Sequence, residues 1–390
     1  MATTLFCWHT TSPLLTELEQ GIALAKQSPA KSLLILSCNQ NNYTPAQLDP
    51  ILTQLDLPVC GGIYPLIIHQ KNVLEQGSLI IGFNEHINIA NFTHLSAIKT
   101  EKALEAYLSD PQYAITIAES SLLMFYDSLV NGVENFLDTL FELLDHDISI
   151  AGGGAGNLDF IQKPCIYSNQ GLLSDTIQLA ALPYDLSIGI AHGWETFKGP
   201  FLVSEAQGQT VHSLNYLPAF ETYKNIIESE SDYCFDTDDF FEIAKHFPLG
   251  IEDINHNLIV RDPILAINNQ LQCLGNVPVN SMVYLLKSNI DTLIDSAKQA
   301  AITSLTPNRN TITTSINDLI QYKHEFSATM VFDCISRDLY MQEDFSREIA
   351  VIAQQCQHST LFGVLSLGEI AKNKSGAIRL LNKSTVIISW

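Results

Sequence analysis

Three stretches of the chain repeat the same order of apolar and polar positions. Each begins with a short apolar run, and these runs are Leu33–Leu36, Leu122–Phe125 and Thr329–Phe332. An amphipathic segment with helical spacing follows each run, and a second short apolar run then reaches a glycine at Gly61, Gly152 and Gly363. The separation from the start of the first run to that glycine is 28, 30 and 34 residues. This order predicts a strand, a crossover helix and a parallel strand, three times along the chain.

A further strand-like run follows each unit after a short distance. The three runs are Ser78–Phe83, Thr176–Leu182 and Ser384–Trp390. Such a short return favours antiparallel pairing, so the sheets should contain both kinds of pairing and be covered by helices. We therefore expect an α/β (mixed α+β) protein with mixed parallel and antiparallel sheets, flanking helices and repeated strand–helix–strand units.

The chain between the second and third units has a different character. The tract Glu228–Glu242 holds seven carboxylates and no basic residue, which is typical of a solvated helix or linker. Short strand-like runs between Phe247 and Lys287 are separated by turn residues and predict an antiparallel meander. We therefore expect two domains, residues 1–219 and residues 220–390.

The charge balance and the cysteine spacing exclude several classes of protein. The 390 residues carry 42 acidic and 20 basic side chains, a net charge of −22, which argues against a nucleic-acid partner and against binding to a membrane surface. The first basic residue is Lys26 and no apolar run approaches about 18 residues, so we expect neither a signal peptide nor a membrane span. Eight scattered cysteines without paired spacing are typical of reduced thiols, so we expect a cytoplasmic protein.

One histidine ends an apolar strand-like run and is a candidate ligand for haem iron. At strand periodicity Ile190, His192 and Trp194 share one face, while Gly193 belongs to the opposite, small-residue face. An imidazole beside an indole in an apolar slot suits a haem ligand. On these residues alone, however, we prefer the interpretation of a core histidine that is hydrogen-bonded to the backbone.

Four other polar residues could together hold a zwitterionic ligand. They are Arg261, Arg337, Glu369 and Asn382. An arginine offers a bidentate fork to a carboxylate, and a glutamate can accept an amine. The alternative interpretation is a set of internal salt bridges that fix the ends of strands.

Two further features have structural interpretations that we prefer. The segment AGGGAGN at 151–157 follows a strand but lacks the third glycine and the helix of a dinucleotide site, so it predicts a tight glycine turn. Cys334 lies near histidines in the sequence, but nothing fixes a nucleophile–base geometry, and a buried cysteine usually packs. We therefore do not expect an enzyme.

Taken in order, the motifs resemble the FIST family, with its N-terminal FIST domain followed by the FIST C domain. The motifs are Gly61–Gly62, GGGAGN at 152–157, AHGW at 191–194, SEAQGQTVHSLNYLPAFETY at 204–223, FPLGI at 247–251, VRDPILAINNQLQCLGNVP at 260–278, FDCISR at 332–337, FGVLSLGEI at 362–370 and NKST at 382–385. The chain departs from the family pattern at Asn157, where an acidic residue is usual, and at Ser336, which replaces a glycine.

The resemblance implies a bacterial sensory protein for a small ligand. Within the family, the chain looks like the NosP group of haem-binding nitric-oxide sensors that regulate a partner histidine kinase. That likeness implies haem b as cofactor, His192 as axial ligand, and Ile190, Gly193 and Trp194 in the haem pocket, with His212 and His246 as the next candidate ligands. The alternative is a haem-free sensor of a solute such as an amino acid, and homo-oligomer formation is left open.

Overall fold

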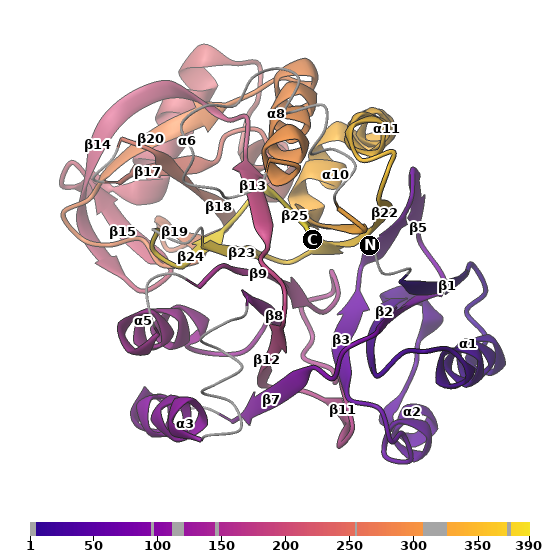
Figure 1. Ribbon diagram of the computed structural model, residues 1–390. Helices are drawn as coiled ribbons and strands as arrows, with labels where there is room; N and C mark the ends of the chain where they lie inside the picture. Colours follow the sequence, from indigo (N-terminus) through magenta and orange to yellow (C-terminus); the bar gives the residue numbers. More distant parts are fainter. Residues whose placement is uncertain are drawn as a thin grey trace, which may run out of the picture.

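The computed structural model describes residues 5–94, 97–110, 121–144, 148–253, 256–306, 326–372 and 376–390. These residues form a body of three six-stranded mixed sheets and a smaller antiparallel β-structure attached to it. Figure 1 shows the three sheets meeting near the middle of the molecule, with their helices on the outside. The mixed α+β architecture predicted from the sequence is confirmed.

Each sheet contains one of the predicted repeats. The first sheet has the order β1 (Phe6–Thr10), β6 (Ser78–Phe83), β2 (Ser32–Cys38), β3 (Val59–Tyr64), β10 (Ile166–Ser168) and β11 (Gly171–Leu173). The second has the order β7 (Asn88–Thr93), β12 (Thr176–Leu182), β8 (Ser121–Asp127), β9 (Ile150–Ala155), β23 (Glu369–Lys372) and β24 (Arg379–Leu381). The third has the order β13 (Ser187–Ala191), β25 (Thr385–Ser389), β21 (Ala328–Cys334), β22 (Thr360–Ser366), β4 (Leu66–His69) and β5 (Asn72–Leu74).

The pairing inside the three sheets is equivalent. The parallel pairs are β2 with β3, β8 with β9, and β21 with β22, and the following strand pairs antiparallel to the first strand in every unit. The helices of the body are α1 (Leu15–Gln27), α2 (Pro45–Leu52), α3 (Ala97–Ser109), α5 (Val133–Leu143), α8 (Ile290–Ser304), α10 (Ile335–Met341) and α11 (Phe345–Gln355). The body therefore has approximate threefold symmetry.

The repeated glycine has the same structural role in each unit. These glycines lie inside β3, β9 and β22, so the expected glycine turn at 151–157 is wrong for Gly152–Gly154. A Cβ atom would lie 2.1, 2.0 and 2.2 Å from a carbonyl oxygen of the adjacent parallel strand, which belongs to Ile35 for Gly61, to Met124 for Gly152 and to Val331 for Gly363. Only glycine allows this close approach of the two backbones.

A shared core joins the three sheets, because each sheet turns one face toward the others. Leu36, Phe125 and Phe332 occupy equivalent positions and belong to one buried cluster, and the rings of Phe125 and Phe332 lie 6.2 Å apart. Each unit also contributes a hairpin to the sheet of another unit. The hairpin β4–β5, which follows the first unit, joins the third sheet; β10–β11, which follows the second, joins the first sheet; and β23–β24, which follows the third, joins the second sheet. The units are therefore interlocked rather than merely stacked.

The third unit differs because a β-barrel is inserted between β13 and α8. Its strands are β14 (Glu195–Gln207), β15 (Thr210–Leu214), β16 (Leu217–Pro218), β17 (Leu249–Glu252), β18 (Leu258–Ile267), β19 (Gln270–Leu274) and β20 (Met282–Lys287), with helices α6 (Ala219–Glu230) and α7 (Phe240–Ala244). The predicted meander is present, and β14 pairs with both β20 and β15 and so closes the ring. The expected boundary between residues 219 and 220 lies in the first turn of α6, inside this structure.

Candidate functional site

The barrel and the body meet at a polar junction that contains two cavities. The chain enters the barrel through the segment 192–194 and leaves it through the segment 288–289, and both segments connect directly to body elements. Among the residues that the structure describes, three ion pairs cross the junction, and they are Arg261–Glu134, Arg379–Asp253 and Lys383–Asp262. Interfaces between structural units are a common place for small-molecule sites.

The first cavity, which we name the junction cavity, has a volume of about 270 Å³ and mostly apolar walls. Its lining residues come from the loop after β9, from α7, β18 and β19 of the barrel, and from α10 and the β22–β23 turn of the body. They are Leu158, Phe160, Phe241, Ile264, Leu274, Cys334, Ile335, Ser336, Leu339, Leu367 and Gly368. The cavity lies at the carboxyl end of the parallel strand β21, the usual position of ligands in sheets with parallel strands.

The polar side chains in this wall are Cys334 and Ser336. Burial, followed by the nearby carboxyl of Glu369, raises the pKa of the Cys334 thiol well above its usual value, so the thiol stays protonated. The hydroxyl of Ser336 donates to Oδ2 of Asp262 at 2.8 Å. Neither group is an activated nucleophile, because a protonated thiol reacts poorly.

A buried ion pair stands directly behind Ser336. The ammonium of Lys383 lies 3.3 Å from Oδ2 of Asp262, donates to the carbonyl of Lys245 at 3.0 Å, and sits 5.1 Å from the centre of the Trp194 ring. Lys383 and Asp262 are both fully buried. Because Lys383 belongs to the body while Asp262 belongs to the barrel, this pair connects the two parts beside the cavity.

Glu369 forms a second buried acidic group near the same wall. Its Oε1 accepts from the Ser366 hydroxyl at 2.8 Å, and its Oε2 lies 3.4 Å from the backbone nitrogen of Ser384, which donates to it. Burial raises the pKa of Glu369 to about 8. The carboxyl group is therefore largely protonated near neutral pH, and it adds no net charge to the buried network.

Internal contacts occupy the N–H groups of the Arg337 guanidinium. Glu348 accepts from its Nε and Nη2 at 2.9 and 2.6 Å, and Oδ1 of Asp333 lies 3.3 Å from Nε. The remaining N–H groups donate to three backbone carbonyls, those of His192, Leu293 and Lys383. Burial alone would lower the pKa of Arg337, but Glu348 and Asp333 together raise it. The side chain has no exposed surface, so it holds elements together rather than binding a ligand.

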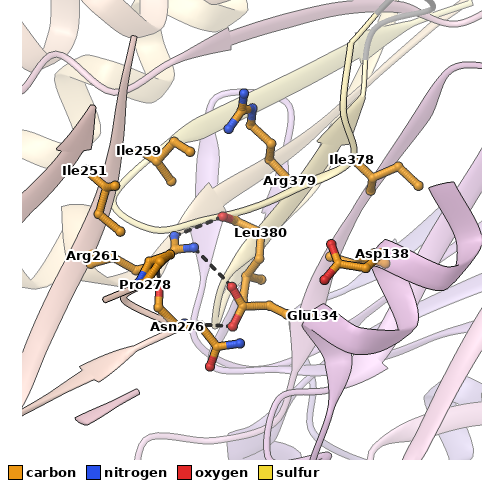
Figure 2. Close-up of a pocket in the computed structure, with 11 residues that line it drawn as sticks. Glu134, Asp138, Ile251, Ile259, Arg261, Asn276, Pro278, Ile378, Arg379 and Leu380 are labelled. Carbon is orange, nitrogen blue, oxygen red and sulfur yellow. Dashed lines mark hydrogen bonds and ion pairs between the residues drawn. The ribbon is translucent and has the colours of Figure 1, made fainter. Parts of the chain in front are cut away.

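Arg261 lies at the second cavity, which has a volume of about 280 Å³ and is shown in Figure 2. Its guanidinium donates to Oε1 of Glu134 at 3.1 Å and to the carbonyls of Leu380, Val260 and Asn276. Oε2 of Glu134 accepts from the backbone N–H of Asn276 at 2.7 Å. Burial lowers the pKa of Arg261. This residue therefore fixes the barrel to helix α5 and strand β24.

His192 lies at the end of β13 with its imidazole partly buried. Its Nδ1 accepts a hydrogen bond from the backbone N–H of Trp194 at 2.9 Å. Burial, and then the charge of Arg337, lowers the pKa of His192 to about 4, so the ring is neutral at pH 7. A neutral ring that accepts at Nδ1 carries its proton on Nε2.

The surroundings of His192 do not fit a haem group. Iron coordination through Nε2 requires that nitrogen to be free of its proton, so the Nδ1 contact would have to break. Gly193 packs on α8, where a Cβ would lie 2.6 Å from the Ser296 hydroxyl, and Trp194 is buried whereas Ile190 is 40% exposed. His192 lines none of the four cavities found among the residues that the structure describes.

The two other candidate histidines do not join His192. His246 packs on the ring of Tyr340 at 4.9 Å, and His212 lines a shallow opening on the barrel near Tyr216. Within the placed part of the chain, no group of three or more His, Cys, Asp or Glu side chains could hold a metal ion.

The structure brings together three of the four residues proposed for a zwitterion. Arg337 donates to Lys383, Glu369 accepts from Ser384, and Asn382 begins the same turn, whereas Arg261 lies at the other cavity. Sequence reasoning missed Lys383, Asp262, Ser336 and Glu348. Lys383 and Ser336 lie inside the NKST and FDCISR motifs, and membership of these motifs was the sequence feature that could have indicated them.

A cavity between a body and an inserted barrel, with a neutralised buried network behind it, is typical of a small-molecule-binding protein. Family models agree with this class: the FIST N domain matches residues 32–216, and the FIST C domain matches residues 219–372. The chain belongs to the FIST family, whose domains are signal-transduction sensors that bind small ligands.

Two individual proteins are similar to this chain. An uncharacterized protein, MJ1623 of Methanocaldococcus jannaschii, is 24% identical over 58% of this chain, and the match covers 48% of that protein, about half its length. A crystal structure of chorismatase aligns over 99% of this chain and 98% of its own with a TM-score of 0.33 and 8% identity, a likeness that carries no functional argument. No helix among the placed residues is long and apolar enough to cross a membrane.

Proposed function

We propose that this chain is a sensory module that binds its small ligand in the junction cavity and reports occupancy through the position of the barrel on the body. The observation that carries this proposal is the cavity itself, which is walled partly by barrel residues such as Ile264 and partly by body residues such as Leu339. A ligand that touches both walls binds one relative position of barrel and body better than another, and so shifts that equilibrium.

Helix α10 connects the cavity wall to both segments that join barrel and body. Ser336 and Leu339 face the cavity, while Arg337 donates to the His192 carbonyl at 2.7 Å and the Tyr340 hydroxyl donates to the Ser288 carbonyl at 2.8 Å. The Ser288 hydroxyl in turn donates to the Gly193 carbonyl at 2.6 Å. A small displacement of α10 therefore acts on the entry and exit segments together.

Hydrogen exchange measured by mass spectrometry tests this arrangement without knowledge of the ligand. Ile264→Trp fills the junction cavity from the barrel side, and it should change amide exchange in the segments 192–195 and 287–290. The matched control is Ile267→Trp on the same strand, because Ile267 is 51% exposed outside the cavity. Equal exchange in both variants would contradict the proposal.

A second variant tests the connection through α10. Tyr340→Phe removes one hydrogen bond worth about 1 kcal/mol and should raise opening of the exit segment about fivefold. It should also weaken the response of the entry segment to Ile264→Trp. Tyr284→Phe is the control, because its hydroxyl binds Glu252 within the barrel.

We propose further that the output partner is a signalling protein such as a sensor histidine kinase, contacted in the cytoplasm, and that the chain has no catalytic role of its own. The net charge of −22 supports a partner with a basic surface, because complementary charge speeds association. An association rate with a candidate kinase that falls steeply as the salt concentration rises would support such a partner.

A haem-based nitric-oxide sensor is the second candidate function, and one observation favours it. The His192 imidazole is neutral at pH 7, as a haem ligand must be. Its hydrogen bond to Trp194 stands against it. Haemin titration of wild type and His192→Ala decides: a sharp stoichiometric Soret band lost in the variant supports haem at this residue, and a broad, non-saturating band contradicts the haem function.

A further inference from the structure

The junction cavity has carbon-rich walls and a single polar end. Leu274 and Ile264 of the barrel face Leu339 and Leu367 of the body across it, and Phe160 stands at its mouth with half of its surface exposed. An exposed phenylalanine at the mouth of an apolar cavity loses unfavourable contact with water when a ligand covers it. The walls therefore favour a ligand with a substantial apolar surface.

No charged side chain lines this cavity among the described residues. Asp262, which accepts from the Ser336 hydroxyl, is itself paired with Lys383 at 3.3 Å, so these two charges balance each other behind the wall. Burying an ionised group without a partner is costly, so a charged ligand would have to bring its own counter-ion. The cavity therefore selects against carboxylates, ammonium groups and phosphates.

The polar end of the cavity offers an acceptor rather than a donor. The Ser336 hydroxyl uses its proton on Asp262, which leaves the lone pairs of its oxygen for a donor in the cavity. The neighbouring thiol of Cys334 interacts with Glu369 and is a weak partner in any case. A ligand N–H or O–H at this end would complete the hydrogen bonding of Ser336.

From these three observations we propose that the ligand is an uncharged, mainly apolar small molecule that presents one N–H or O–H donor to Ser336. This inference rests on the proposed function and specifies its ligand class. A volume of about 270 Å³ lies just below the range for small-molecule sites, about 300–1,000 Å³, so the ligand is small.

The test uses three probes of similar shape on the full chain. Indole is neutral with one N–H donor, 1-methylindole lacks the donor, and indole-3-carboxylate adds a negative charge. Calorimetry should show indole binding to wild type, with indole-3-carboxylate at least about tenfold weaker. Ser336→Ala should weaken indole about fivefold and leave 1-methylindole unchanged. Ser37→Ala is the matched control, because Ser37 is equally buried and hydrogen-bonded in the first sheet.

Three results would overturn the ligand class. The first is binding of indole-3-carboxylate as tight as that of indole and lost in Ile264→Trp, which would leave the proposed function standing. The second is an equal effect of Ser336→Ala on indole and 1-methylindole, and the third is no binding of any probe. The exchange experiment with Ile264→Trp uses no probe, so it separates failure of the ligand class from failure of the sensor proposal.

Discussion

The buried position of Arg337 gives a quantitative prediction about its two carboxylate partners. Glu348 makes two short contacts with the guanidinium, at 2.9 and 2.6 Å, while Asp333 makes one longer contact at 3.3 Å. All three side chains are without exposed surface. Burial, followed by the charge of Glu348, raises the pKa of Asp333 well above its usual value. We therefore predict that Glu348, which makes the shorter contacts, balances the charge of Arg337, and that Asp333 is protonated.

The expected magnitudes follow from that assignment. Removing one partner of a buried ion pair costs about 3–5 kcal/mol. In Glu348→Gln the like charge near Asp333 disappears, so Asp333 can ionise beside Arg337 and restore a charged hydrogen bond worth about 1.5–3 kcal/mol. The free energy of unfolding of Glu348→Gln should then be about 2 kcal/mol lower than that of the wild type. Asp333→Asn exchanges one neutral group for another and should lose less than about 1 kcal/mol.

The double variant should lose the whole cost of an unpaired guanidinium, about 3–5 kcal/mol, which exceeds the sum of the single losses. Urea unfolding at pH 7 measures the free energy of unfolding for all four proteins. Glu343→Gln, an exposed position one turn before Glu348, is the control and should have no effect. Additive losses would refute the reasoning, because they would mean that Asp333 does not take over the charge.

Two other predictions concern Glu369 and the repeated glycine. Because the pKa of Glu369 is about 8 in the folded protein and its usual value is 4.5, the folded state retains a proton that the unfolded state releases, and its contribution to stability is lost as the pH rises through this window. Glu369→Gln should therefore gain in unfolding free energy relative to wild type from pH 5 to pH 8, by at most about 1.4 kcal/mol per pH unit, and a constant difference in urea unfolding across that range would contradict this. Gly363→Ala should lower the free energy of unfolding by about 3 kcal/mol or fail to fold, because its Cβ meets the Val331 carbonyl. The control Gly132→Ala, with open space around it, should lower the free energy of unfolding by about 1 kcal/mol. Equal melting temperatures for the two variants would contradict the role of the close strand approach.

Local sequence patterns were sufficient to predict the units but not how the units interlock. The apolar runs at Leu33–Leu36 and its two counterparts predicted the parallel pairs, because buried strands joined by a helix leave a strong period in the sequence. The exchanged hairpins, such as β4–β5, could not be predicted, since a two-stranded hairpin carries no information about which sheet edge it will join. For the same reason the barrel closure between β14 and β15 was not predicted.

The candidate site was predicted in part. Arg337, Glu369 and Asn382 do meet around one turn, yet the contacts of Arg337 are internal and Arg261 is elsewhere. Lys383 was missed because a single lysine between polar residues usually lies at the surface. Its burial depends on Asp262, 121 positions earlier in the chain, and a pairing over that distance is set by tertiary structure alone.

In the part of the chain that the structure describes, the junction cavity lies at one of three equivalent strand ends, and the inserted barrel distinguishes this end from the other two. Cys38, Asp127 and Cys334 end β2, β8 and β21 in equivalent register. At the first two ends residues outside the barrel satisfy the side chain: the Cys38 thiol donates to the Leu74 carbonyl, and Asp127 accepts from Leu129, Gln162 and Asp175. At the third end the barrel replaces a short connection, and its strands approach without filling the space above Cys334. The insertion thus supplies both the cavity and the part whose position, in our proposal, reports ligand binding, which is why we place ligand binding and signal output at the same junction.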